Sequence, residues 1–174
     1  MSETVPAKPP RGVALEDIAA FAALLSPMSR LIGIDAGTKT LGLALSDVTR
    51  TIASPLLTIA RTKFTKDIEA LLALVAQHNV TGLVLGFPAN LDGTEGPRAQ
   101  STRAFAHNLN ALTPLPILFW DERLSTAAAE RTLLEADQSR KRRAEVIDKM
   151  AATIILQGAL DRMRHAARSI AGGA

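Results

Sequence analysis

The sequence predicts an α/β fold with a mixed five-stranded sheet and helices packed on it. Three apolar runs follow one another with short connections, which is typical of an antiparallel meander. After them, segments with helical spacing of apolar residues alternate with two further apolar runs. Antiparallel strands followed by alternating helices and strands indicate a sheet that combines antiparallel and parallel pairing.

The meander is expected within residues 31–59. Residues 31–36 and 40–46 are apolar runs separated by Gly37, Thr38 and Lys39, a connection short enough for a hairpin turn. Residues 52–59 can add a third strand, and Pro55 would be tolerated there if that strand lies at an edge of the sheet.

The remaining elements alternate along the chain. A helix is predicted where apolar residues recur at Ile68, Leu71, Leu72 and Val75. Pro97 is suited to open a later helix, and Ser125 to cap another. In order, the predicted elements are a helix over 67–77, a strand over 81–87, a helix over 97–109, a strand over 116–120 and helices over 125–135 and 144–165.

The ends of the chain are predicted to lie outside the folded domain. Residues 1–28 are expected to be a flexible extension, because Pro6, Pro9 and Pro10 fall in its first part; a short helix can form over residues 13–25. Residues 29–168 would form one domain and residues 169–174 a flexible tail. Met28 is an alternative start of the chain.

Composition excludes several classes of protein. The 174 residues include no cysteine, which rules out a disulfide scaffold, Cys-ligated zinc and a thiol nucleophile. No apolar run reaches the roughly 18 residues that a membrane span needs. Glu16 and Asp17 interrupt the apolar stretch that could pass for a signal peptide. We therefore expect a cytoplasmic protein without membrane contact.

Positive charge is concentrated near the C-terminus. Residues 30–136 carry ten basic and ten acidic side chains, whereas residues 138–168 carry eight basic and three acidic ones. Such a patch indicates a nucleic-acid partner, although a solvated helix start would look the same. With no tyrosine and five phenylalanines, contacts to backbone and shape should outweigh base stacking. Four of the basic residues are consecutive: Arg140, Lys141, Arg142 and Arg143.

Acidic residues stand where a metal site could form. Asp35 ends the first strand, Asp121 and Glu122 follow the last strand, and Asp148 lies on a face of small residues in the long helix. Carboxylates without Cys or clustered His suit Mg²⁺ or Mn²⁺, and two such ions can stabilise the attacking and leaving oxygens of a phosphodiester displacement. The alternatives are a turn at Asp35, a pair or cap at Glu122 and a salt bridge at Asp148.

Three segments resemble the RuvX/YqgF family of bacterial nucleases, which have an RNase H-like fold and are related to Holliday-junction resolvases. They are IDAGTKTLGLALSD at 34–47, GFPANLDGTEGP at 86–97, and DERLST at 121–126 continuing to Asp148-Lys149 and Ala151-Ala152. Together they span roughly residues 30–162. The resemblance implies that residues 29–168 form an RNase H-like nuclease domain with five strands and flanking helices.

The resemblance also implies roles for single residues. Asp35, Glu122 and Asp148 would be the catalytic carboxylates and the metal ligands. Glu122 is preferred over Asp121, because Asp121 continues the strand and could orient Arg123, but either could face the metal. Thr40 stands where relatives often carry a basic residue, so one phosphate contact is expected to be missing. The substrate contacts implied are Lys39, Asn90, Gly93, Arg123, Arg140, Lys141, Arg142 and Arg143.

The function implied is 5′-end maturation of the 16S ribosomal RNA precursor by hydrolysis with Mg²⁺ or Mn²⁺. The partners would be rRNA precursor and the ribosomal subunit precursor, with the protein a monomer or homodimer. Two alternatives remain open: a Holliday-junction resolvase acting on branched DNA as a two-fold dimer, and a non-catalytic RNase H-like binding module. The chain length argues against an actin-like ATPase, which needs two such domains.

Overall fold

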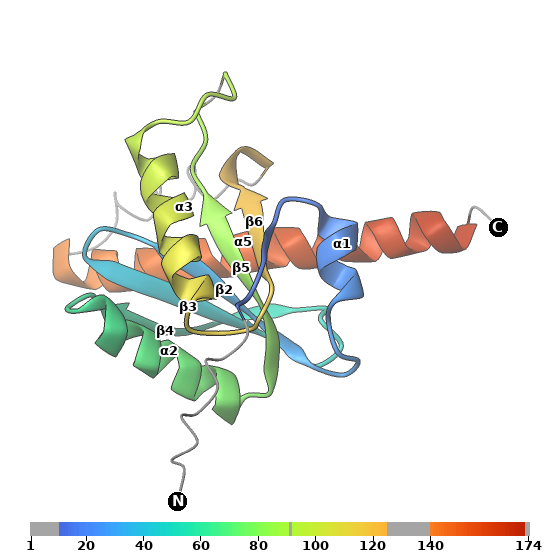
Figure 1. Ribbon diagram of the computed structural model, residues 1–174, viewed down its shortest axis with the longest axis horizontal. Coiled ribbons are helices and arrows are strands. Elements are labelled where there is room, and N and C mark those ends of the chain that lie inside the picture. The colour runs from blue at the N-terminus through green and yellow to red at the C-terminus, as the bar shows by residue number, and fades with distance from the viewer. Residues whose placement is uncertain (1–10, 91, 125–139, 173–174) are drawn as a thin grey trace, which may run out of the picture.

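The computed structural model describes residues 11–90, 92–124 and 140–172, with the side chains of 140–148 and 171 left out. Six strands form one sheet in the order β1-β6-β5-β2-β3-β4 (Figure 1). The strands are β1 Ala14–Leu15, β2 Arg30–Ala36, β3 Thr40–Ser46, β4 Ala53–Ala60, β5 Val80–Phe87 and β6 Ile117–Asp121. The helices are α1 Ile18–Ala23, α2 Phe64–Gln77, α3 Pro97–Asn110 and α5 Arg140–Gly172, with a 3₁₀ turn, η1, at Glu122–Leu124.

The pairing confirms the predicted mixed sheet. β2, β3 and β4 form an antiparallel meander, and β5 and β6 extend it by parallel pairing next to β2. Pro55 lies in the edge strand β4, opposite Ala44, where the register shifts and the missing N–H costs no regular ladder bond. Strands β2 to β6 therefore reproduce the meander and the two further strands that the sequence predicts.

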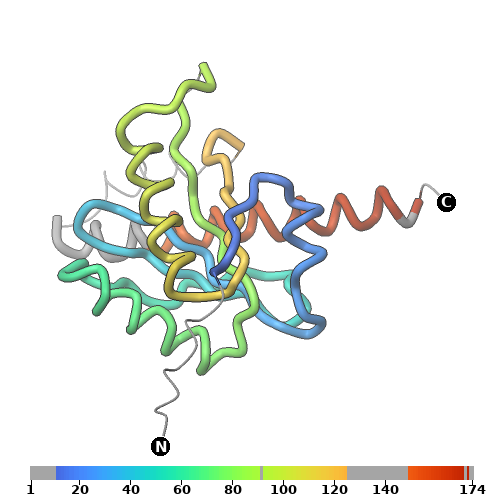
Figure 2. Tube along the Cα trace, in the orientation of Figure 1, coloured from blue at the N-terminus to red at the C-terminus, as the bar shows by residue number. Residues whose placement is uncertain are grey.

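The prediction of five strands was wrong by one. Ala14 and Leu15 form β1, which pairs in parallel with Ile117 and Leu118 of β6. A strand of two residues has no hydrophobic periodicity, so the stretch 13–25 was expected to be a single helix. Instead α1 begins later, where the Asp17 carboxylate accepts hydrogen bonds from the N–H groups of Ala19 and Ala20. Figure 2 shows this N-terminal segment running beside β6.

Helices cover both faces of the sheet. α2 and α3 pack on the face that includes Ile32, Ile34 and Leu85, and α5 packs on the face that includes Leu31 and Val84 (Figure 1). Phe21 of α1 is completely buried in the second of these clusters. The domain boundary at residue 28 stays a prediction, but β1 and Phe21 belong to the packed structure.

The last helix is longer than predicted. α5 runs from Arg140 to Gly172, so the run of basic residues lies in its first turn rather than before it. Arg and Lys are good helix formers, and the strong apolar stripe that guided the prediction covers only the middle of the helix. The helix predicted over 125–135 lies outside the described residues. Among the helices that are described, none has the length and apolar character needed to cross a bilayer.

Candidate active site

Asp35 is buried at the end of β2 and faces α5. Asp35 is only 4% exposed to solvent. Gly33, two residues earlier, lies against α5 so closely that a Cβ atom on it would be 2.8 Å from the carbonyl oxygen of Ala152. Residues two apart in a strand share a face, so Asp35 points to the same side of the sheet. The close approach at Gly33 therefore brings α5 over the carboxylate.

Glu122 reaches the same face at the same end of the sheet, because β6 runs parallel to β5 and β5 parallel to β2. It begins η1, directly after β6, and its Oε1 atom lies 2.7 Å from where a Cβ atom on Gly86 would be. Ile155 of α5 lies at the same position, which places the Glu122 carboxylate on the α5 side of β5. Because Ile34 pairs with Leu85, the next residues of the two strands, Asp35 and Gly86, lie level with each other. The two predicted acids thus converge at neighbouring strands.

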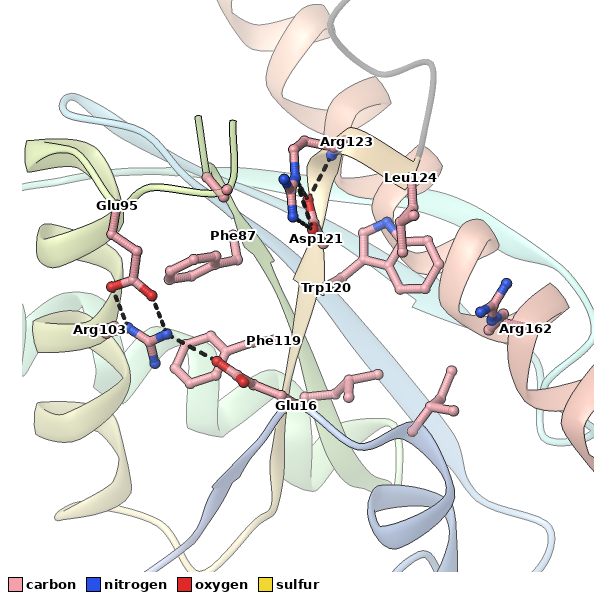
Figure 3. A pocket seen from close by; sticks show the side chains of 14 residues that line it. Glu16, Phe87, Glu95, Arg103, Phe119, Trp120, Asp121, Arg123, Leu124 and Arg162 are labelled. Carbon is pink, nitrogen blue, oxygen red and sulfur yellow. Dashed lines mark hydrogen bonds and ion pairs between the residues drawn. The ribbon is translucent and has the colours of Figure 1, made fainter. Parts of the chain in front are cut away.

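Asp121 lies on the opposite face and is held by Arg123. The guanidinium donates to both carboxylate oxygens, with Nε 3.0 Å from Oδ1 and Nη2 2.6 Å from Oδ2 (Figure 3). These hydrogen bonds from Arg123 lower the pKa of the Asp121 carboxyl below its usual value. The two acids that the sequence left as alternatives therefore lie on different faces: Asp121 is paired with Arg123, and the Glu122 carboxylate lies on the α5 side at Gly86.

For Asp148, the third predicted acid, the structure describes only the backbone. Asp148 belongs to α5, one helical turn before Ala152, the residue that lies over Gly33. Its side chain lies outside the described residues, as do those of Arg140, Lys141, Arg142 and Arg143. Within the described part of the chain, no three His, Cys, Asp or Glu side chains gather closely enough to hold a metal ion. Of the three predicted acids, Asp35 and Glu122 are the two whose side chains are described, and both lie on the α5 face at the level of Gly86.

The loop before α3 folds back onto Arg123. The Asn90 N–H donates to the carbonyl of Thr94, and the Gly93 N–H donates to the carbonyl of Asn90. Gly93 has a φ of 87°, a left-handed conformation that a residue without Cβ adopts readily. Arg123 Nη1 lies 3.4 Å from the Asn90 carbonyl oxygen. The structure therefore brings together Asn90, Gly93 and Arg123, three of the predicted substrate contacts.

Lys39 lies apart from that group. It is exposed in the turn between β2 and β3 and lines a groove that opens on the α2 and α3 face of the sheet. Among the predicted substrate contacts that the structure describes in full, Lys39 therefore borders a different pocket from Gly93 and Arg123.

Sequence reasoning missed an ion-pair network centred on Arg103 of α3. Its Nε atom donates to Glu95 Oε2 at 2.8 Å, and its Nη2 atom donates to Glu16 Oε1 at 2.9 Å (Figure 3). The same group lies 4.7 Å from the ring centroid of Phe87 and 5.4 Å from that of Phe119. The network borders a pocket of about 430 Å³. No local spacing could have revealed it, because Glu16 is distant in the sequence.

The chain is similar to several known proteins. A protein of Paracoccus denitrificans named "Putative pre-16S rRNA nuclease" is 63% identical over 154 residues, which cover 88% of this chain and 98% of that protein. One of the same name from Paramagnetospirillum magneticum is 66% identical over 139 residues, covering 80% and 90%. The solved structure of RuvC from T. thermophilus in complex with a Holliday junction substrate aligns with 78% of this chain and 96% of its own, at 13% identity and a TM-score of 0.49. Residues 29–162 match the family described as "RuvX: Holliday junction resolvase", so the resemblance is confirmed and the chain belongs to the RuvX family.

Proposed function

We propose that this protein is a metal-dependent nuclease that hydrolyses a phosphodiester bond in the 5′-end maturation of the 16S rRNA precursor. The observation that carries the proposal is the convergence of Asp35 and Glu122 on the α5 face, at the level of Gly86. The substrate follows from the name shared by relatives that are more than 60% identical to this chain. We place the protein in the cytoplasm, acting on rRNA within the ribosomal subunit precursor as a monomer or homodimer.

The donor set fits a hard divalent cation. Burial of a carboxylate such as Asp35 is costly unless cations or hydrogen-bond donors meet it, and oxygen ligands are those that Mg²⁺ and Mn²⁺ prefer. In this proposal Asp35, Glu122 and Asp148 are the catalytic residues and the ligands. When bound there, Mg²⁺ or Mn²⁺ supplies positive charge for the attacking water and for the leaving oxygen of the phosphodiester.

The other residues of the site bind and orient the substrate. Asp121 fixes Arg123 in one orientation, and Arg123 in turn contacts the backbone at Asn90, so a phosphate would meet a preorganised cation beside an open loop. The left-handed Gly93 allows the chain of the substrate to approach the loop closely. Lys39 and the run Arg140, Lys141, Arg142 and Arg143 would bind phosphates farther along the strand. The sequence has no cysteine to act as a nucleophile, which suits attack by water.

The description of the matched family supports a second candidate, cleavage of four-way DNA junctions. One experiment separates the two. Wild type and Asp35→Asn are incubated with Mg²⁺ or Mn²⁺ and with two labelled substrates, the 5′ leader of 16S precursor RNA and a four-way DNA junction. Asp161→Asn, which changes an exposed acid on α5 paired with Arg164, is the matched control.

We expect wild type and Asp161→Asn to cut the RNA and Asp35→Asn to lose at least about 100-fold in rate while remaining folded. Paired symmetric cuts in the junction, without cuts in the RNA, would favour the resolvase. Binding without cleavage of either substrate in either metal would overturn the nuclease proposal in favour of a non-catalytic module. Loss of the folded state in Asp35→Asn would make that carboxylate structural.

A further inference from the structure

The groove beside the β2–β3 turn has no role in the catalysis described above. We propose that it binds the phosphodiester backbone of a single-stranded nucleic acid that extends from the active site across the end of β2. The inference rests on the proposed function, because it takes the nucleic acid held at Asp35 and Glu122 as its starting point. It adds Arg61 and Arg98, which no sequence motif singled out, as phosphate-binding residues.

The groove is large and lies close to the proposed active site along the chain. Its volume is about 850 Å³, within the range of ligand sites in proteins. The β2–β3 turn forms one wall, beginning at Ala36, the residue after Asp35. The starts of α2 and α3 form the others. A strand leaving Asp35 would thus meet the groove as soon as it crossed the end of β2.

The groove carries net positive charge. Lys39, Arg61 and Arg98 line it together with a single acid, Asp67. Asp67 is only 5% exposed, and its Oδ1 accepts hydrogen bonds from the N–H and the hydroxyl of Thr62 at 3.1 and 3.2 Å. Lys39 and Arg98 are exposed, and neither has an ion-pair partner among the described side chains. Three cations therefore line the groove, and within the described part of the chain none of them forms an ion pair.

Arg61 is held in place for binding an anion. Its Nη1 donates to the carbonyl of Gly37 at 2.6 Å, and its guanidinium carbon lies 5.6 Å from the ring centroid of Phe105. A guanidinium has five N–H donors in a rigid plane, a geometry that matches the oxygens of a phosphate. Since one donor and one face are used to fix the group, the remaining donors can bind a ligand without much loss of side-chain entropy.

The floor of the groove favours backbone contacts over base stacking. Phe105 is covered by Arg61, and Phe64 meets it edge-on, with ring centroids 5.8 Å apart. Phe105, which is only 5% exposed, therefore offers no open face on which a base would stack. The ligand must also bend from the α5 face to the α2 and α3 face over a short turn. Duplex DNA resists bending on that scale, since its persistence length is about 150 base pairs, whereas a single strand can follow such a path.

Binding can be tested without cleavage. Labelled oligouridylate is titrated with the full chain, without divalent ions, over a series of salt concentrations, using fluorescence anisotropy. We expect Arg98→Ala to raise Kd roughly fivefold and to lower the slope of log K against log salt by about 0.7, the value for one phosphate contact on a single strand. Arg98→Lys should keep the wild-type slope, since it keeps the charge.

Arg168→Ala is the matched control, because Arg168 is an exposed arginine near the far end of α5 with no described ion pair. It should bind like wild type. Equal Kd and equal salt slope in wild type and Arg98→Ala would overturn the inference, as would a greater loss for a DNA duplex than for the single strand. If wild type binds RNA but cleaves none, the proposed function fails while this test still decides the role of the groove.

Discussion

The Oε1 atom of Glu122 lies 2.7 Å from the position that a Cβ atom would take on Gly86. The missing side chain at residue 86 therefore provides the space that the Glu122 carboxylate occupies. Ile155 of α5 borders the same space, with its Cδ1 atom 2.5 Å from that position. A glycine within a buried strand such as β5 is costly to stability, so its use here indicates that the space serves the carboxylate.

Gly86→Ala is expected to lower the cleavage rate strongly and to change the stability of the fold little. The added methyl group would meet the ends of two flexible side chains, Glu122 and Ile155, which can move aside. Displacing the carboxylate by about 1 Å can reduce the rate about 100-fold. The measurements are the cleavage rate on the RNA leader and the midpoint of urea unfolding. Gly172→Ala is the control, because a Cβ atom there meets nothing within 4 Å. Wild-type cleavage by Gly86→Ala would show that Glu122 need not occupy this position.

Gly33→Ala is expected to lower the stability of the fold. Its Cβ atom would lie 2.7 Å from the Cβ atom of Leu156 and 2.8 Å from the carbonyl oxygen of Ala152, and neither atom belongs to the flexible end of a side chain. Relief requires α5 to shift away from the sheet, at a cost of about 1–3 kcal/mol. The urea midpoint should fall without a change in m-value. An unchanged midpoint would mean that α5 is not held as closely to β2 as the structure indicates.

The elements that the sequence predicted best are those with a strong local pattern. Strand β3 has the predicted bounds, since polar turns flank its apolar run. The convergence of Asp35 and Glu122 was also predictable, because both follow buried strands that end at one edge of the sheet. β1 and the Arg103 network could not be predicted, because each depends on partners far away in the sequence: Ile117 for β1 and Glu16 for Arg103.

Asp47 is expected to make stability depend on pH in the acid range. Its carboxylate accepts hydrogen bonds from the N–H groups of Ile52 and Thr51 and from the hydroxyl of Thr49, and these lower its pKa from 3.8 to about 2. Since the folded pKa is below the unfolded one, the stabilisation is complete well above pH 3.8 and is lost as pH falls toward 2.

Asp47→Asn tests this contribution. It should cost about 1 kcal/mol at pH 7, a modest value because the turn between β3 and β4 is partly exposed to solvent. The loss should shrink as pH is lowered, because the wild-type carboxylate is then protonated as well. Urea unfolding of both proteins at a series of pH values from neutral to acid provides the measurement. A difference between the two proteins that stays constant with pH would rule out titration of Asp47 as its cause.

Within the Arg103 network, Arg103→Ala should lower the free energy of unfolding more than Glu16→Gln does. Arg103→Ala removes the bonds to Glu95 and Glu16 and the contacts with two phenyl rings, and the ring contacts alone are worth about 1 kcal/mol. Glu16→Gln should cost less than about 0.5 kcal/mol, because its side chain is 69% exposed and solvent screens the pair.

Thermal unfolding at low and high salt checks both values. Salt should reduce the small effect of Glu16→Gln and leave most of the effect of Arg103→Ala, since contact with the rings is less screened than an exposed ion pair. Equal effects of the two replacements would mean that the ion pair with Glu16, rather than the packing on Phe87 and Phe119, anchors this arginine.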